Sequence, residues 1–396
     1  MTNLSDLFPA GAGKQVSFVA SGTLGNGVTV ALKTDGTVEA ISGATGSAGT
    51  PVVFETASTS EISATFDSDS NKVVIAYRDL GNSNYGTAIV GTVSGTAISF
   101  GTAVVFETAS TSNISATFDS DSNKVVIAYR DVGNSNYGTA IVGTVSGTSI
   151  SFGTAVVFET ATSGYMSATF DSNENKVVIA YRDGGNSNYG TAIVGTVSGT
   201  SISFGTAVVF ETANVTYLDA TFDSTSDKVV IAYTDYGNSS YGTGIVGTVS
   251  GTAISFGTAV VFEAADTSYI SSAFDTVAGK VVFAYTDIGN SYYGTAIVGT
   301  VSGTAISFGT PAVWKTDSTG ANKSVVYDTN ADKSIISYHD QNSTGDATVV
   351  VGTVTGTAIA FGSDVVVATG NCYEINSVYD STNYKVVTLY YDYDNS

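Results

Sequence analysis

A unit of about 52 residues recurs along nearly the whole chain, and this periodicity limits the folds that the chain can adopt. One aspartate of the string YRDVGNSNYG recurs with spacings of 52, 52, 52, 52, 53 and 52 residues. A second anchor, an aromatic residue followed by Asp, runs in step with it from Phe66 to Tyr379. The chain therefore predicts an array of seven equal structural units, whose marker aspartates are Asp79, Asp131, Asp183, Asp235, Asp287, Asp340 and Asp392.

Each unit contains four segments with the chemistry of β-strands. In the first unit these are residues 61–67, 72–79, 86–93 and 97–106, separated by turns of Asp, Asn, Ser and Gly. The segment KVVIAYRD is apolar on both sides, so both of its faces must be covered. Four strands in meander order, repeated at this spacing, are typical of a propeller blade buried between two neighbours. We predict an all-β, seven-bladed β-propeller with four-stranded antiparallel blades.

The two ends of the sequence indicate how the ring closes. The seventh unit stops after two strands, whereas residues 27–43, after Asn26, align with the third and fourth strands of the other units. We expect residues 27–53 and 373–396 to build the last blade together, which removes two exposed sheet edges. Residues 25–396 then form the propeller. Residues 1–24 form an N-terminal arm that either lies on the propeller or attaches it to a neighbouring subunit.

Charge and cysteine content exclude several classes of protein. The formal net charge is −21, and only 14 residues are Lys or Arg, which argues against nucleic-acid and anionic-membrane partners. The single cysteine, Cys372, cannot form an internal disulfide. The N-terminus has no basic start followed by an apolar run, so no classical signal peptide is expected, and no apolar stretch suits a membrane helix.

The most faithful part of the repeat is the loop D-x-G-N-S-x-Y-G. We expect Asp to accept hydrogen bonds from loop amides, Gly to supply a positive φ, and Tyr to close the turn. The loop resembles the Asp-box of sialidases and related propellers, although Tyr replaces the usual Trp and the loop joins the second and third strands. Its predicted role is structural, at Asp79, Gly81, Ser83 and Tyr85 and at Asp131, Asp183, Asp235 and Asp287.

The turn DSDSNK superficially resembles a calcium-binding loop. The other copies keep only its first Asp, and the distal carboxylate of a calcium loop is missing. We therefore expect a plain turn and no cofactor, with weak calcium binding at Asp67, Asp69 and Asn71 as the alternative.

The connections between units vary most, and meander order places them on the same face as the D-x-G-N-S loops. Exposed aromatic rings beside small polar groups suit sugar binding, because a ring stacks on a pyranose while polar groups bond its edge. A loop that drifts without functional demand is the alternative, and both stay open. The predicted ligand-binding residues on this rim are Tyr165, Tyr217, Tyr269, Tyr373, Asn113 and Asn214.

Catalytic chemistry finds little support in the sequence. Arg78, Arg130 and Arg182 occupy equivalent positions in three adjacent units and are expected to be spread around the ring. His339 stands alone, and no nucleophile–base pair or metal-ligand cluster emerges. We predict that the protein is not an enzyme.

The segment LFPAGAGKQVSFVASGTL, followed by units of the form NKVVIAYRDxGNSNYGTAIVGTVSGTSISFGT, resembles repeat proteins of tailed bacteriophages of aquatic bacteria, of the tail-fibre-like or virion structural type. This resemblance implies a virion-surface propeller that contacts host-surface polysaccharide within an oligomeric assembly and is made in the cytoplasm without a signal peptide. The alternatives are a scaffolding or extracellular filament subunit assembled through residues 1–24 and, third, a glycosidase.

Overall fold

The computed structural model describes residues 30–32, 38–40 and 48–395, and the predicted arm of residues 1–24 lies outside them. The chain divides into two compact units, residues 1–47 and 48–396. In the first unit, β1 (Val30–Leu32) and β2 (Val38–Ala40) form an antiparallel pair in which Ala31 lies opposite Glu39. Two strands are thus present within residues 27–43, the segment predicted to supply strands to the last blade.

The second unit is an all-β array of antiparallel strands. The long first strand of each repeat pairs with its second strand, and in six repeats the second strand pairs with a third. The first strands are β3 (Thr59–Asp67), β7 (Val104–Asp119), β11 (Val156–Asp171), β15 (Val208–Asp223), β19 (Val260–Asp275), β23 (Ala312–Asp328) and β28 (Cys372–Asp380). The second strands are β4 (Lys72–Asp79), β8 (Lys124–Asp131), β12 (Lys176–Asp183), β16 (Lys228–Asp235), β20 (Lys280–Asp287), β24 (Lys333–Asp340) and β29 (Lys385–Asp392).

In six repeats a third strand follows, and two separate segments pair with its outer edge. The third strands are β5 (Tyr85–Ser94), β9 (Tyr137–Ser146), β13 (Tyr189–Ser198), β17 (Tyr241–Ser250), β21 (Tyr293–Ser302) and β25 (Asp346–Thr355). The end of each pairs with a short fourth strand: β6 (Ala97–Phe100), β10 (Ser149–Phe152), β14 (Ser201–Phe204), β18 (Ala253–Phe256), β22 (Ala305–Phe308) or β26 (Ala358–Phe361). Its beginning pairs with the start of the next long strand or, in the sixth repeat, with β27 (Val365–Ala368).

This continuity corrects the expectation of a loop between units. β7 begins as the outer edge of the first repeat, where Val104 lies opposite Ala88, and ends as the first strand of the second, where Asp119 lies opposite Lys124. The chain bends before β7, at residues 101–103, and shifts register inside it between Ser112 and Ser115. The variable segment is therefore a bulged strand and not a free loop.

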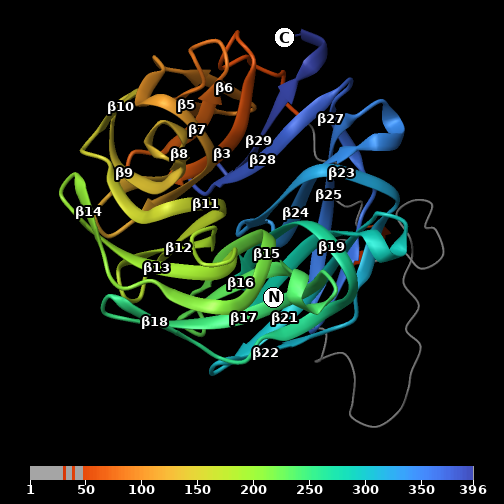
Figure 1. The fold of residues 1–396 in the computed structure, drawn as a ribbon. Coiled ribbons are helices and arrows are strands. Elements are labelled where there is room, and N and C mark those ends of the chain that lie inside the picture. The colour runs from red at the N-terminus through yellow and green to blue at the C-terminus, as the bar shows by residue number, and fades with distance from the viewer. Residues whose placement is uncertain (1–29, 33–37, 41–47, 396) are drawn as a thin grey trace. The chain divides into compact units, whose positions relative to one another are not determined.

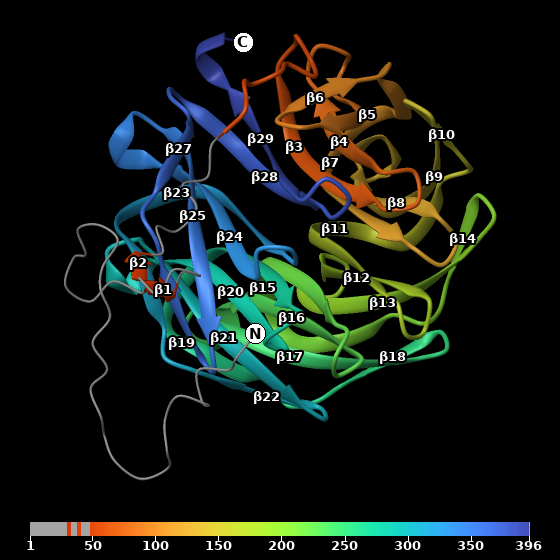
Figure 2. The ribbon, with the colours of Figure 1, turned by 180° about the vertical axis from the view of Figure 1, so that it is seen from behind.

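The repeats follow one another around a ring (Figures 1 and 2), and β28 lies beside β3. A circuit of seven equivalent hydrogen bonds joins the first strands: a side chain of each repeat accepts the backbone N–H of the next. In the first step the N–H of Ala116 donates to Oγ of Ser63 at 3.0 Å, and in the last the N–H of Ala64 donates to Oδ1 of Asn376 at 3.1 Å. The other acceptors are Ser115, Ser167, Asp219, Ser271 and Ser324.

The circuit matters because the inner half of each first strand, which carries these groups, is paired with the second strand on one edge only. Unpaired backbone donors that lose water cost free energy, so a side-chain acceptor from the preceding repeat stabilises this edge. The arrangement is propeller-like, with the first strands innermost.

The core lies between the repeats. Every side chain from Val73 to Tyr77 on β4 has no exposed surface, as expected for a strand covered on both faces. Tyr129 packs against Phe106 with ring centroids 5.2 Å apart, and its hydroxyl donates to Oε2 of Glu107 at 3.0 Å. The aromatic contact recurs in the first six repeats and the hydrogen bond in the first five, and there they tie the second strand to the preceding outer edge.

Five single-turn 3-10 helices complete the described structure. They lie at the ends of second strands and are η2 (Val132–Asn134), η3 (Tyr236–Asn238), η4 (Ile288–Asn290), η5 (Gln341–Ser343) and η6 (Tyr393–Asn395). None of the helices among the described residues is long and apolar enough to cross a lipid bilayer.

Candidate functional face

The D-x-G-N-S loops lie at one end of the second strands and frame the candidate site. Oδ1 of Asp79 accepts the backbone N–H of Asn82 at 3.0 Å, as predicted for a structural loop. Equivalent bonds are made by Asp131, Asp183, Asp235 and Asp287. Tyr85 begins β5 and is half-buried, and its N–H donates to the carbonyl of Asn82 at 3.1 Å.

The predicted role of the loop glycine is wrong. The positive φ values belong to Ser83 (57°) and Asn84 (63°), and not to Gly81. Glycine is needed for space: a Cβ on Gly81 would lie 2.3 Å from Cβ of Ala57, a distance that no pair of carbon atoms tolerates. The loop is therefore held against the segment that precedes β3 in the same repeat.

Each of the seven first strands contains a bulge, and the bulge places one variable residue at the equivalent position of every repeat. The bulge residue has a left-handed backbone in every repeat, which is rare for non-glycine residues and for large ones is a marker of strain or function. We call these residues the bulge ring: Glu61 (φ 56°), Asn113 (50°), Tyr165 (46°), Tyr217 (47°), Tyr269 (50°), Asn322 (63°) and Glu374 (52°).

Part of the bulge ring is held by its own side chains. Oε2 of Glu374 accepts the N–H of Glu61 at 3.2 Å, and Oε2 of Glu61 accepts the N–H of Asn113 at 3.0 Å. Oδ1 of Asn113 then accepts the N–H of Tyr165 at 2.6 Å. Neighbouring repeats are thus linked twice on this half of the ring, once by the seven-bond circuit and once by these bulge contacts.

The other half of the bulge ring is aromatic. The rings of Tyr165 and Tyr217 meet edge to face with centroids 5.4 Å apart, and those of Tyr217 and Tyr269 are 4.6 Å apart. Burial, followed by the interactions with Tyr269, raises the pKa of the Tyr217 hydroxyl, which stays protonated and able to donate a hydrogen bond. The three rings form an arc of half-buried tyrosines.

The structure brings together four of the six predicted rim residues: Asn113, Tyr165, Tyr217 and Tyr269 all belong to the bulge ring. Tyr373 does not, because the bulge residue of the seventh repeat is Glu374. Tyr373 is 39% exposed and contacts the His339 ring at 4.8 Å.

Asn214, the sixth predicted rim residue, is also outside the ring. It lies opposite Tyr189 at the start of β13 and is half-buried. Ligand binding by any of the six stays a prediction.

The three arginines lie beside the bulge ring. Nε of Arg78 donates to Oγ of Ser60 at 2.9 Å, and Nε of Arg130 donates to Oγ of Ser112 at 2.7 Å. The third repeat has Gly164 at the serine position, and there the Arg182 guanidinium lies over the Tyr165 ring, 4.7 Å from its centroid.

The three arginines, which come from three adjacent repeats as expected, influence one another electrostatically. Burial lowers the pKa of the Arg130 guanidinium; Glu61 raises it, and repulsion from Arg182 and Arg78 lowers it further. The charge on Arg130 is therefore influenced by Arg78 and by Arg182, so the three guanidinium groups interact electrostatically.

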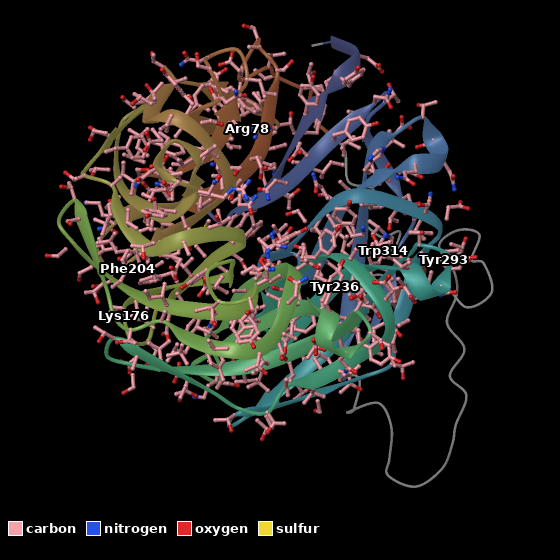
Figure 3. The ribbon with its side chains drawn as sticks, viewed as in Figure 1. Arg78, Lys176, Phe204, Tyr236, Tyr293 and Trp314 are labelled. Carbon is pink, nitrogen blue, oxygen red and sulfur yellow. The ribbon has the colours of Figure 1, made fainter. Side chains whose placement is uncertain are left out.

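A hollow of about 500 Å³ opens on the same face between the fourth and sixth repeats. Four tyrosines line it: Tyr217 and Tyr269 of the bulge ring, and Tyr236 and Tyr292, each 52% exposed, from the loops. Among its polar lining residues are Asp266, Ser268, Thr286, Ser318 and Gln341. In Figure 3, Tyr236 lies closer to the middle of the ring than Phe204 and Lys176.

Tyr236 and Tyr292 were missed by the sequence prediction, although the sequence carries a signal. Tyr236 stands where earlier repeats have Leu80, Val132 and Gly184, and Tyr292 stands where Asn84 begins the series. Both are departures from the repeat in its most faithful segment. The predicted rim residues all come from the variable strand, which does not include these loop positions.

Lys323 is a second residue that the prediction missed. It is 7% exposed, its Nζ donates to Oγ1 of Thr286 and to the carbonyl of Gly320, and it lies 5.5 Å from the Tyr269 ring centroid. Burial lowers its pKa to about 7. Two features of the sequence indicate this residue. The spacing between marker aspartates is 53 residues only in this repeat, and the position of Lys323 is apolar and buried in the other six repeats, where it is occupied by Ile62, Ile114, Met166, Leu218, Ile270 and Ile375.

The turn once compared with a calcium loop lies at the opposite ends of the strands. Oδ1 of Asp67 accepts the N–H groups of Asp69 and Ser70 at 3.0 and 2.9 Å, and Asn71 has φ 56°. These are the bonds of a self-contained turn. Among the described residues no cluster of three or more Asp, Glu, His or Cys is placed to hold a metal ion, and weak calcium binding here stays a prediction.

The sequence matches no protein-family model and no curated protein. Among solved structures, the chain is similar to the BP39L lectin of Burkholderia pseudomallei, with 10% identity, coverage of 85% of this chain and 94% of that one, and a TM-score of 0.60. It is also similar to a protein from Lactobacillus plantarum (12% identity, 89% and 96% coverage, TM-score 0.54) and to a mutant of AofleA from Arthrobotrys oligospora (10%, 85% and 90%, 0.51). At these identities the likeness concerns the fold alone.

Proposed function

We propose that the protein is a non-enzymatic, carbohydrate-binding β-propeller. The observation that carries the proposal is the hollow lined by Tyr217, Tyr236, Tyr269 and Tyr292 with Asp266 and other polar side chains. Aromatic faces stack on the apolar faces of pyranose rings, and the surrounding carboxylate, amide and hydroxyl groups bond the sugar hydroxyls. A protein of similar fold, BP39L, is described as a lectin, which supports this assignment.

The proposal is tested by glycan-array binding of the wild type and of the double variant Tyr236→Ala/Tyr292→Ala. Both side chains are half exposed, so their removal leaves the fold intact, and we expect binding to fall below detection. Tyr384→Ala is the matched control, because Tyr384 is 55% exposed in a turn at the opposite strand ends. Full binding by the double variant, or no binding of any glycan by the wild type, refutes the proposal.

We further propose that the ring has seven blades and that residues 27–53 complete the last one. Three observations support this. The seven-bond circuit runs through seven first strands, and β28 and β29 form a two-stranded sheet where six other repeats have third and fourth strands. The pair β1–β2 lies in the segment predicted to supply those strands.

Two truncations test the completion of the last blade. Deleting residues 1–47 exposes the apolar strand β29, so we expect a lower melting temperature and aggregation, which strand edges promote. Deleting residues 1–24 alone leaves both properties unchanged. Equal stability of the two truncated proteins contradicts the proposed closure.

The setting we propose is a virion or cell surface, where the ring acts as a tail-fibre-like adhesin on host polysaccharide. The resemblance of the repeats to phage tail proteins supports it, as does an aromatic hollow suited to sugars. Immunogold labelling of particles from the source culture tests the location. Release of reducing ends from a broad polysaccharide panel by the purified protein would instead indicate a glycosidase.

A further inference from the structure

We propose that the arginine half of the functional face binds the carboxylates of an acidic glycan, a uronate-type chain whose neighbouring sugars occupy the tyrosine hollow. This rests on the proposed carbohydrate function and adds the chemical class of the ligand. It assigns Arg78, Arg130 and Arg182 as ligand-binding residues. They are all the arginines of a chain whose net charge is −21, and all three are on one face.

Within residues 48–395, the terminal Nη groups of the three arginines lack hydrogen-bond and ion-pair partners. Only the Nε atoms of Arg78 and Arg130 donate to a described side chain, and the terminal Nη groups of all three arginines make no hydrogen bond within residues 48–395. Among the described residues the ion pairs involve only Lys315, with Asp340 and Asp364. Half-buried guanidinium forks without acceptors are costly, and a carboxylate satisfies them with paired, charge-assisted bonds.

The nearby carboxylates do not fill this role. Glu61 and Glu374 each use one oxygen to accept a backbone N–H of the bulge ring, which holds them in the architecture. Two carboxylates also face three guanidinium groups, so the cluster keeps an excess positive charge. An added anion lowers the repulsion that Arg130 experiences from both of its neighbours.

The arginines are continuous with the tyrosine arc. The Arg182 guanidinium lies 4.7 Å from the Tyr165 ring, Tyr165 contacts Tyr217 at 5.4 Å, and Tyr217 lines the hollow. An oligosaccharide that follows this arc meets stacking rings at one end and guanidinium groups at the other. That sequence of contacts fits a chain with acidic substituents better than a single neutral sugar.

The fold does not require arginine at these positions. The fourth and fifth repeats have Thr234 and Thr286 instead, whose hydroxyls donate to the carbonyls of Thr267 and Thr319 at 3.0 and 3.3 Å. Threonine therefore folds correctly at the same site in the same frame. This supplies a substitution that removes the charge without disturbing the ring.

The test compares two fluorescent probes, oligogalacturonate and its methyl ester, which differ in the carboxylate charge and in one methyl group per sugar. We expect the wild type to bind the acid at least about tenfold more tightly, the equivalent of one charge-assisted hydrogen bond. In the triple variant Arg78→Thr/Arg130→Thr/Arg182→Thr this preference disappears. The control variant Lys72→Thr/Lys124→Thr/Lys176→Thr removes the same charge from the opposite strand ends of the same repeats and keeps the preference.

The outcomes separate the two proposals. No binding of the acidic probe by the wild type, equal binding of acid and ester, or a preference that survives in the arginine variant overturns the inference. Neutral glycans that still bind through Tyr236 and Tyr292 leave the carbohydrate function standing in that case. If the arginine variant melts more than a few degrees below the wild type, the single Arg130→Thr variant replaces it, with the same criteria.

Discussion

Replacing Lys323 by methionine is predicted to stabilise the protein in a strongly pH-dependent way. Lys323 occupies a position that is aliphatic in the other six repeats, including Met166, and its ammonium has no carboxylate partner within the described residues. Burial lowers its pKa from 10.5 to about 7. Between these values the unfolded chain binds a proton that the native protein does not.

The magnitude follows from linkage. Because the native pKa is depressed and the group is a base, the stability of the wild type rises with pH, by about 1.4 kcal/mol per pH unit between pH 7 and pH 10. Below pH 7 the buried charge costs about 5 kcal/mol at most. Lys323→Met removes this cost but also loses the hydrogen bonds to Thr286 and Gly320, which contribute about 1 kcal/mol each. The free energy of unfolding of the variant at pH 6 should therefore exceed that of the wild type by about 2–3 kcal/mol.

Urea unfolding at pH 6, 7.5, 8.5 and 9.5 measures the difference for wild type and Lys323→Met, provided that each shows a single transition. From pH 7.5 to pH 9.5 the wild type should gain about 2.7 kcal/mol relative to the variant. His339 is one titratable neighbour, and burial lowers its pKa, so it stays neutral from pH 7.5 to pH 9.5. Lys333→Met, at a half-exposed lysine, is the control. Parallel pH curves for wild type and Lys323→Met refute the reasoning.

Three further substitutions probe the frame, each by urea or thermal unfolding. Tyr129→Phe leaves an oxygen of Glu107 without the 3.0 Å hydrogen bond that it accepts, and should cost about 1–3 kcal/mol; a neutral result means that water replaces the hydroxyl. Gly133→Ala places a methyl group 2.3 Å from Cβ of Ala109, and should cost about 1–3 kcal/mol with a shifted loop; unchanged stability shows that the loop moves freely. Asp235→Ala removes the acceptor, at 2.8 Å, of a loop amide and should cost about 1 kcal/mol; no loss shows that the loop is held by its other contacts.

The β-strands of the repeat were predictable because local chemistry and tertiary demand agree in them. Val73 to Tyr77 form an uninterrupted apolar run, which only a strand covered on both faces accommodates, and all five side chains are fully buried. The Asp67 turn was equally clear, since its carboxylate bonds its own amides and depends on no distant residue. The repetition strengthens these predictions, because the same residue pattern recurs in each copy.

The bulge ring was not predictable in this form. Tyrosine rarely adopts a left-handed φ, so the sequence of residues 162–168 does not predict the bulge at Tyr165. The backbone accepts it because Oδ1 of Asn113, 52 residues earlier, receives its N–H. The role of Gly81 was predicted wrongly for a related reason: glycine is required there by Ala57, which is distant in the sequence although it belongs to the same repeat, and not by its own φ. Contacts with residues distant in the sequence decide these positions, and a local pattern does not contain them.

The departures from symmetry say more about function than the symmetry does. A ring of equal repeats offers as many equal sites as it has repeats, yet here arginine occurs in three neighbouring copies, tyrosine occupies the bulge in three, and Lys323 in one. The register shift and the left-handed φ of the bulge occur in every repeat, whichever side chain stands there, so the frame does not demand these side chains. One half of the face carries the three arginines and the other half carries the tyrosines, so the two halves are chemically different. A ligand that uses both halves fits in one orientation, and the proposals therefore require one glycan chain per ring. A calorimetric titration that saturates at several equivalents would place the sites between the repeats and away from this face.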